Sequence, residues 1–184
     1  SRARQQGVVI SPKLIFENPT IAELAAAADQ AAGASGLEGL VQAEQGPVVG
    51  EAPLTPVQRW FFDLSIPNPN HWNQSVLISL PVKIEPRQLE AAVLALMEQH
   101  DALRGRFITG EDGERRMVYD PPQETAPLLW QDLSTCSSAE IEQQLAAGLD
   151  SAQASLDLEN GPVFRAAAFW LGESRGSRLL LAAH

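Results

Sequence analysis

Cysteine is nearly absent from this 184-residue sequence, which has only Cys136. A lone cysteine excludes a disulfide framework and a CxxC metal site. The chain has three histidines, His71, His100 and His184, which are scattered without the spacing of metal ligands, so we expect no metal site. This composition fits a reducing compartment, and we expect a cytoplasmic protein.

Positive charge is also scarce. The chain has 13 lysines and arginines against 23 aspartates and glutamates, a formal net charge of −10. This balance argues against nucleic acid or an anionic membrane as the main partner. No apolar run approaches the roughly 20 residues of a membrane span, and the first residues lack the apolar core of a secretory signal. We therefore expect no nucleic-acid partner and no membrane partner.

What the sequence does have is enough apolar residues, 45%, for one globular domain with a core and a small appendage. The stretch "PTIAELAAAADQAA" predicts a helix, with Thr20 as N-cap and Glu23 completing a capping box. Residues 33–52 are glycine-rich and poorly periodic, which predicts a flexible linker. A second domain is expected from Pro53 onward.

The second domain opens with "LTPVQRWFF", which predicts a helix that begins after Thr55. Thr55 is a good N-cap, and Gln58 lies where a capping box needs it. Four apolar residues recur at helical spacing and predict one buried face: Val57, Trp60, Phe61 and Leu64. We accordingly interpret the three consecutive aromatic residues, Trp60, Phe61 and Phe62, as core anchors.

Helices and strands alternate along the rest of the chain. Alternation in "NQSVLISLPV" predicts a strand, "GRFITGEDGERRMVYD" a β-hairpin with a solvated turn, and "SSAEIEQQLAAGLDSA" a helix with a capping box between Ser137 and Glu140. The segment "GPVFRAAAFWLGESRGSRLLLAAH" predicts two strands around a turn. This pattern favours an α/β or α+β sandwich without deciding between them.

The positions of His100 and His71 in the sequence indicate their roles. A long helix is expected over residues 86–103, and His100 falls on its apolar face with Leu89 and Val93. We therefore interpret His100 as a core histidine rather than a catalyst. His71 lies in the polar loop "PNPNHWNQ", where we expect a structural or solvent-facing residue rather than a functional one.

Several segments, taken in order, resemble the condensation superfamily of nonribosomal peptide synthetases. "PVQRWF" is similar to the opening motif of epimerization domains, P-I-Q-x-W-F, with Val57 for Ile. "HDALRGRF" resembles the superfamily motif R-H-x-x-L-R-x-x-F, with Gln99 for the first Arg. "LDLENGPVFRAAAF" resembles the segment before the active-site strand, and "RLLLAAH" the approach to H-H-x-x-x-D, with His184 as its first histidine. The resemblance covers residues 53–184.

The beginning of the chain has a resemblance of its own. "ISPKLIFENPTIAELAAAA" is similar to the end of a peptidyl carrier domain, whose last helices often carry F-x-x-P-T-I-x-x-L-A. The two resemblances together imply a carrier end at residues 1–32, a linker at 33–52 and the N-terminal lobe of an epimerization or condensation domain at 53–184.

The implied fold is α/β, the first lobe of a chloramphenicol acetyltransferase-like sandwich, preceded by the last helices of an all-α carrier bundle. Such proteins have two similar lobes, with the histidine motif at the seam. We expect the strand that ends at His184 to lack its outer neighbours, so that this truncated chain exposes apolar surface.

The implied chemistry is inversion of the α-carbon of an aminoacyl or peptidyl thioester, L to D, presented by a carrier. The reaction needs a positioned base and acid and electrostatic support for the enolate oxygen. The resemblance gives His184 a supporting role in the catalytic motif, and Arg104 or Arg106 a role in orienting the motif's aspartate. The plain alternative is that both arginines are solvated. The motif's second histidine and a glutamate would lie beyond His184, so we expect this chain alone to be inactive.

The resemblance also concerns cofactors and partners. No cofactor is expected to bind this chain directly, because phosphopantetheine would be carried by a carrier serine upstream of it. The partners would be a loaded carrier domain and neighbouring synthetase domains. Two alternatives stay open: a condensation, or dual condensation–epimerization, domain that forms a peptide bond between two carrier-bound substrates, and a non-catalytic piece that tethers neighbouring domains.

Overall fold

The computed structural model describes residues 8, 10–33 and 46–184, and the chain divides into two compact units, Ser1–Gln45 and Gly46–His184. The described part of the first unit contains α2 (Pro12–Glu17) and α3 (Ile21–Gly33). The predicted capping box of α3 is confirmed, because Thr20 N donates to Glu23 Oε2 (3.1 Å) and Glu23 N donates to Thr20 Oγ1 (3.3 Å). That these helices come from a carrier domain stays a prediction. No helix among the described residues is long and apolar enough to cross a membrane.

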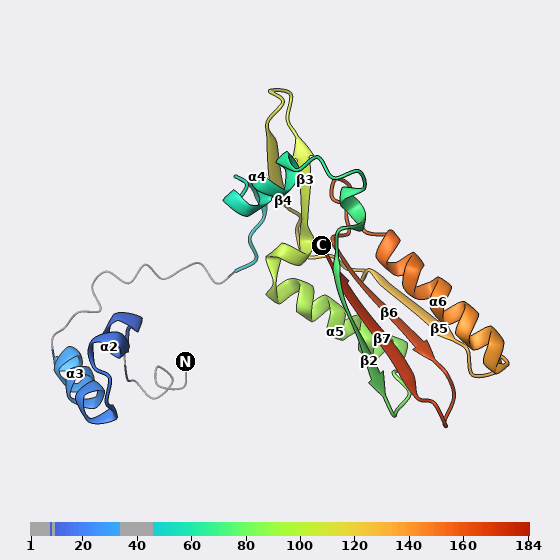
Figure 1. Cartoon of the computed structure of the whole chain (residues 1–184), viewed down its shortest axis with the longest axis horizontal. Helices are drawn as coiled ribbons and strands as arrows, with labels where there is room; N and C mark the ends of the chain where they lie inside the picture. Colours follow the sequence, from blue (N-terminus) through green and yellow to red (C-terminus); the bar gives the residue numbers. More distant parts are fainter. Residues whose placement is uncertain (1–7, 9, 34–45) are drawn as a thin grey trace. The chain divides into compact units, whose positions relative to one another are not determined.

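The second unit is built from two sheets and three α-helices (Figure 1). A three-stranded sheet has the order β1-β4-β3, and a four-stranded sheet has the order β2-β7-β6-β5. The bounds are β1 (Gly50–Ala52), α4 (Pro56–Asp63), η1 (Pro69–His71), β2 (Gln74–Leu80), α5 (Pro86–Gln99), η2 (Asp101–Arg104), β3 (Gly105–Thr109), β4 (Arg115–Tyr119), β5 (Leu128–Asp132), α6 (Ser138–Ala154), β6 (Phe164–Trp170) and β7 (Ser177–Ala183).

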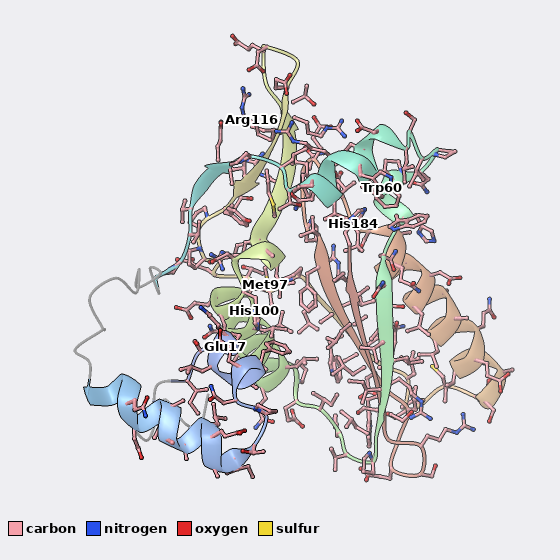
Figure 2. The ribbon with its side chains drawn as sticks, turned by 60° about the vertical axis from the view of Figure 1, so that its left-hand side comes forward. Glu17, Trp60, Met97, His100, Arg116 and His184 are labelled. Atoms are coloured by element: carbon pink, nitrogen blue, oxygen red, sulfur yellow. The ribbon has the colours of Figure 1, made fainter. Side chains whose placement is uncertain are left out.

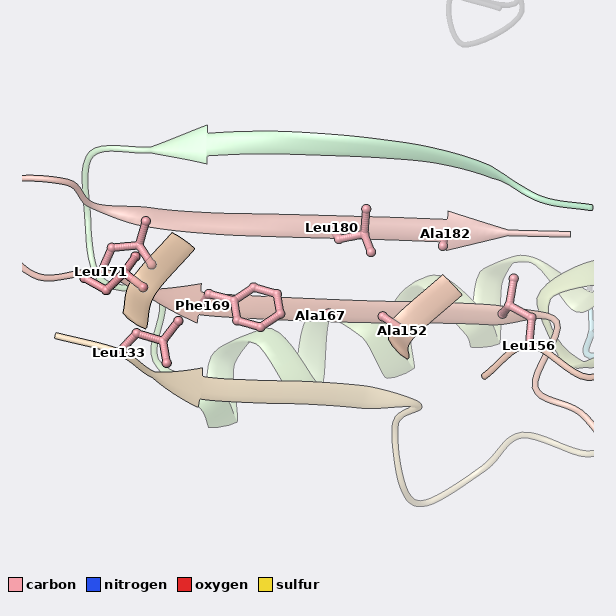
Figure 3. Packing of buried hydrophobic residues seen from close by; sticks show 9 residues of the cluster. Leu133, Ala152, Leu156, Ala167, Phe169, Leu171, Leu180 and Ala182 are labelled. Atoms are coloured by element: carbon pink, nitrogen blue, oxygen red, sulfur yellow. The ribbon is translucent and has the colours of Figure 1, made fainter. Parts of the chain in front are cut away.

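The four-stranded sheet carries the core on both of its faces. Strand β6 alternates between them: Ala166 and Ala168 belong to the cluster with α5, whereas Ala167 and Phe169 belong to the cluster with α6. Figure 3 shows the second cluster, in which Phe169 lies with residues of β7 and α6. Because β6 is buried on both faces, its sequence is continuously apolar after Arg165 instead of alternating.

The predicted hairpin and the capping box of α6 are confirmed. β3 and β4 pair antiparallel in the register Gly105↔Tyr119 to Thr109↔Arg115, and the acidic turn between them is exposed. The carboxylate of Glu140 accepts from the backbone N of Ser137 (2.8 Å). The two terminal strands are also confirmed, as β6 and β7.

Two sequence-based expectations about chain boundaries are wrong. Part of the expected linker, residues 34–45, lies outside the described residues, but its end does not: Gly50–Ala52 form β1 and pair with β4. The strand that ends before His184 does not lack neighbours. β7 lies inside the sheet, paired with β2 on one side and β6 on the other, so the edge with exposed apolar side chains is β2, at Val76 and Leu77.

The expected helix over residues 86–103 is shorter in the structure, and this overturns the interpretation of His100. α5 ends at Gln99, and His100 is its C-cap, with an extended backbone at φ −122° and ψ 92°. Leu89 and Val93 are buried as predicted. His100 leaves their face because the helical spacing stops one residue before it, and its side chain is exposed.

The aromatic helix α4 begins as predicted but buries a different face. Thr55 N donates to Gln58 Oε1 (2.8 Å), which confirms the capping box. The expected buried stripe is wrong, because Val57, Trp60 and Leu64 are 65%, 60% and 45% exposed. Trp60 is therefore not a core anchor. Phe61, the fourth residue of the expected stripe, is half-buried, and so are Gln58 and Phe62, so this face of α4 points inward although none of its residues is fully buried.

Candidate functional site

An apolar pocket of about 250 Å³ lies at the junction of α4, the β3–β4 hairpin and the end of β7. Its lining comes from segments far apart in the sequence: Val57, Gln58, Phe61, Phe62, Trp72, Ala102, Phe107, Met117, Leu158, Val163 and His184. His184 is the one lining residue with an ionisable side chain. A pocket with apolar walls and a single imidazole is a candidate site for an apolar group held beside a titratable ring.

His184 is fixed in this pocket by three contacts. Its Nε2 lies 2.8 Å from the carbonyl oxygen of Pro69, its backbone N donates to the carbonyl of Val163 (2.9 Å), and its ring stands edge-on to that of Phe61. A carbonyl can only accept, so Nε2 carries the proton in the neutral ring, and Nδ1 is left with its lone pair. Figure 2 shows His184 on the same side of this unit as Trp60.

The surroundings of His184 favour its neutral form. The side chain is half-buried, and burial lowers its pKa from the ordinary value, partly opposed by the hydrogen bond to the Pro69 carbonyl. The other ten lining residues carry no charge that could stabilise an imidazolium. At neutral pH the ring is therefore an uncharged donor at Nε2 and an acceptor at Nδ1.

The aromatic residues of α4 link His184 to the hairpin. Phe61 contacts the rings of Phe62 (centroids 5.3 Å apart) and Trp72 (6.3 Å), and Phe62 stands edge-on to Phe107 of β3 (5.1 Å). The Arg115 guanidinium lies over the ring of Phe62, 4.1 Å from its centroid. Edge-to-face pairs at these distances are favourable and directional, so they fix the ring positions in the pocket wall.

Gln58 and Trp72 also bring polar side-chain atoms to the pocket lining, and those of Gln58 are already engaged. Its Oε1 accepts from Thr55 N, and its Nε2 lies 3.4 Å from Met117 Sδ. The capping box therefore has a second consequence beyond starting the helix. Because Gln58 is committed and the indole of Trp72 can only donate, His184 Nδ1 is left as the free nitrogen acceptor among the lining side chains.

Arg104 is buried, with 2% of its surface exposed, so the alternative that it is solvated is wrong. Its guanidinium donates to Asp101 Oδ1 (2.6 Å) and to four backbone carbonyls, those of Val48, Met97, Glu98 and Asp120. These contacts hold the end of α5, the start of β1 and the end of β4 together. That Arg104 also orients a motif aspartate stays a prediction.

Arg106 is only partly buried. Its Nε lies 3.0 and 3.1 Å from the two carboxylate oxygens of Asp120, and about a third of each side chain is exposed. Its neighbour in β3, Phe107, points into the His184 pocket. Because successive side chains of a strand point to opposite faces, Arg106 points away from that pocket. Its role in orienting an aspartate likewise stays a prediction.

The structure separates the three histidines. His71 and His100 are both exposed, which fits the solvent-facing alternative for His71, whereas His184 lines the apolar pocket. No cluster of three or more His, Cys, Asp or Glu side chains suited to a metal ion occurs within the described ranges. Sequence reasoning missed Pro69, Phe107 and Met117 as site residues. These three residues come together only in the folded structure, so no local sequence motif could have identified them.

Comparisons with known proteins all match this chain to nonribosomal peptide synthetases or their domains. A family model described as the condensation domain matches residues 48–184. A linear gramicidin synthase of Brevibacillus parabrevis is 44% identical over 184 residues, 100% of this chain and 4% of that protein. A surfactin synthase of Bacillus subtilis (strain 168) is 37% identical over 185 residues, 100% of this chain and 5% of that protein.

Solved structures agree with the sequence matches. The epimerization domain from the third module of tyrocidine synthetase B is 31% identical, with a TM-score of 0.67 over 77% of this chain and 32% of that one. The first condensation domain of the calcium-dependent antibiotic synthetase, in complex with a substrate analogue, is 23% identical, with a TM-score of 0.60 over 73% of this chain and 32% of that one. The second likeness shows the shared fold alone.

Proposed function

Because the chain belongs to the condensation-domain family of nonribosomal peptide synthetases, we propose that it is part of a module that acts on a carrier-bound aminoacyl or peptidyl thioester. We infer further that the reaction is epimerization at the α-carbon, from L to D. The chain spans only 4–5% of the length of the two synthases compared above, so this activity is a property proposed for the whole module.

One observation carries the choice of epimerization. The likeness to the epimerization domain of tyrocidine synthetase B, at 31% identity and a TM-score of 0.67, is stronger than that to the condensation domain, at 23% and 0.60. The run Gln58-Arg59-Trp60-Phe61 supports the same choice, because it resembles the opening motif of epimerization domains.

The second candidate is condensation, in which a peptide bond forms between two carrier-bound substrates. It is favoured by the condensation-domain model, which matches residues 48–184. The two reactions differ in the number of loaded carriers that they need. Epimerization needs one loaded carrier, whereas condensation needs a donor and an acceptor.

In either reaction we propose that His184 positions the chain that follows it instead of transferring the proton itself. Its Nε2–H donates a hydrogen bond to the Pro69 carbonyl, and its ring packs edge-on against the ring of Phe61. A neutral, half-buried ring held in this way anchors the end of β7 to the loop before β2. In epimerization, the apolar wall beside the ring would strengthen electrostatic interactions with an enolate oxygen that forms nearby.

We further propose that α2 and α3 are the end of a carrier domain. The gramicidin and surfactin synthases match this chain over its full length, so the segment before Gly46 accompanies the condensation-family part in those proteins too. The phosphopantetheine arm of the carrier would deliver the thioester. We propose no covalent attachment of that arm to any residue described above.

The experiment uses the intact module with one loaded carrier and no acceptor. After loading with an L-amino acid, the thioester is hydrolysed, and the D and L forms are separated by chiral chromatography. Epimerization predicts a D,L mixture under these conditions, whereas a purely condensing domain predicts L alone. His184→Ala should slow the appearance of the D form, and His100→Ala, which changes an exposed histidine, should not.

A further inference from the structure

An ion pair holds the backbone of Val48, close to the point where the chain enters the second unit at Gly46. The N–H of Val48 donates to Asp101 Oδ1 (3.1 Å), and its carbonyl accepts from Arg104 Nη2 (3.4 Å). The same Nη2 lies 2.6 Å from Asp101 Oδ1, so the three residues form a closed ring of hydrogen bonds. Both hydrogen-bonding groups of the Val48 backbone are therefore satisfied by side chains, as a neighbouring strand would satisfy them in a sheet.

Arg104 gives this contact a fixed base. A guanidinium has five N–H donors. In Arg104, Nε donates to the carbonyl that follows β4, Nη1 to two carbonyls at the end of α5, and Nη2 to Val48 and Asp101. Hydrogen bonds from Arg104 and then from the Val48 amide lower the pKa of Asp101, so its carboxylate is charged at neutral pH. The acceptor of the Val48 amide is therefore a charged group held by a fully buried partner.

Apolar burial contributes little to holding the segment before β1. Val48 and Val49 are 43% and 58% exposed. Gly50, whose φ of 104° lies in the region that favours glycine, then leads into β1, which pairs with β4 over three residues. A three-residue strand at the edge of a sheet has few bonds to resist local opening. We therefore expect the ion pair to decide whether residues 46–52 stay on the second unit.

This segment is also the covalent connection to the helices of the first unit. The condensation-domain model begins to match at residue 48, so the ion pair acts at the start of the family's own sequence. A tethered group reaches its partner at an effective concentration that depends on the length of the tether between its two points of attachment. The position of the first held residue therefore matters for any group that the first unit delivers.

We propose that the Asp101–Arg104 pair is a clamp that fixes the entry of the chain at Val48, and that Asp101 is thereby a positioning residue for delivery of the carrier-bound thioester. The clamp depends only on contacts within the second unit. Its role in delivery rests on the proposed function, because it requires that α2 and α3 belong to a carrier.

The size of the effect on delivery follows from the tether. Release of residues 46–52 lengthens the connection from the end of α3, at Gly33, to the first held residue by about a third. The glycine-rich sequence before Gly46 predicts a flexible connection, for which the effective concentration falls roughly as the −3/2 power of length. Delivery within the module should then slow by roughly 1.5-fold.

The clamp is tested on the 184-residue chain by amide hydrogen exchange, followed by NMR. Asp101→Ala should speed exchange of the Val48 amide by roughly tenfold or more, because the amide loses a charged acceptor. Asp101→Asn keeps the oxygen without the charge and should give an intermediate rate, and it replaces the alanine variant should that fail to fold. Asp132→Ala is the matched control, because Asp132 also accepts from a backbone N–H, that of Ser134 (2.9 Å), and lies near Lys83. Unchanged Val48 exchange in both Asp101 variants, or an equal increase in the control, would overturn the proposal.

The role in delivery is tested on the intact module with two forms of one substrate. The same aminoacyl group is attached to the carrier or supplied as a soluble pantetheine thioester, and the rate at which the D form appears is measured for each. Asp101→Ala should lower the ratio of the carrier-bound rate to the soluble rate by roughly 1.5-fold. An unchanged ratio would overturn the role of Asp101 in delivery. If the module condenses instead, the same ratio is measured from peptide bond formation, so that a failure of the proposed epimerization is distinguished from a failure of the clamp.

Discussion

The imidazole of His184 stands edge-on to the ring of Phe61, with centroids 5.1 Å apart and an interplanar angle of 82°. These two residues lie far apart in the sequence, the first at the end of β7 and the second in α4. The contact places the expected catalytic-motif histidine against the aromatic helix. It also explains why three aromatic residues follow the capping box: two of them, Phe61 and Phe62, build the wall in which the histidine is held.

The burial of His184 predicts that stability falls on mild acidification. Because the folded-state pKa is lowered, the ring is neutral in both states above about pH 6.5. Below that value the unfolded chain takes up the proton first, so the free energy of unfolding decreases until the folded-state pKa is reached. Urea unfolding between about pH 7.5 and 5 should show this loss, and His184→Gln, which can still donate to Pro69, should flatten it.

The control is His71→Gln, at an exposed loop histidine, which should keep the wild-type pH slope. Hydrogen bonds from Arg104 and from the Asn160 amides lower the pKa of Asp101 and Asp157 below the ordinary range, so both titrate at more acidic pH. An unchanged slope in His184→Gln would contradict the assignment of a buried neutral ring.

Arg104→Gln should be among the most destabilising single substitutions in the chain. It leaves several buried carbonyls without their donor, which predicts a loss of about 2–4 kcal/mol. Arg106→Gln is the matched control, because its pair with Asp120 is about one-third exposed and worth at most about 1 kcal/mol. Chemical denaturation measures both, and equal losses would refute this contrast.

Gly148→Ala should destabilise α6 although alanine is the better helix former. A methyl group there would lie 2.5 Å from a ring carbon of Phe169, which is fully buried and has no room to move. Overpacking costs about 1–3 kcal/mol, which outweighs a propensity gain of about 1 kcal/mol. Thermal unfolding should show a lower Tm, and Gly148→Ala/Phe169→Leu should recover part of it. A raised Tm in the single variant would show that the helix tolerates the methyl group.

The exposed face of α4 predicts binding of an environment-sensitive apolar dye. Val57, Trp60 and Leu64 form an exposed stripe, and Trp72 nearby is also 60% exposed. Trp60→Gln should reduce dye fluorescence with little effect on stability, whereas Trp170→Phe, at a 5% exposed site, should leave the dye signal unchanged. A dye-silent wild-type chain would contradict the exposed position of Trp60.

Local signals explain which parts of the fold were predictable. The capping boxes at Thr20, Thr55 and Ser137 were all predicted, because each is decided by side chains three residues apart. The buried face of α4 was predicted wrongly. Helical spacing correctly placed Phe61 on the inward face, but the choice of Phe62 over Trp60 depends on Phe107 of β3, which lies far away in the sequence.

The candidate site was predictable only in part. His184 came from the resemblance to a motif, and the structure adds what holds it: the Pro69 carbonyl and the ring of Phe61. The wrong interpretation of His100 has a similar cause. Its spacing from Val93 fits a helix, yet α5 ends one residue earlier, and no residue type in "EQHDALR" marks that end.

The most direct measurement is deuterium incorporation at the α-carbon of the carrier-bound amino acid. The intact module is loaded in D₂O with one carrier and no acceptor, and the mass of the released amino acid is measured by mass spectrometry. Epimerization predicts that one deuterium replaces the hydrogen at that carbon, more slowly in His184→Ala and at an unchanged rate in His71→Ala. A released amino acid without deuterium would contradict this account. A second reaction with a loaded acceptor carrier would then identify a condensing domain if product is transferred.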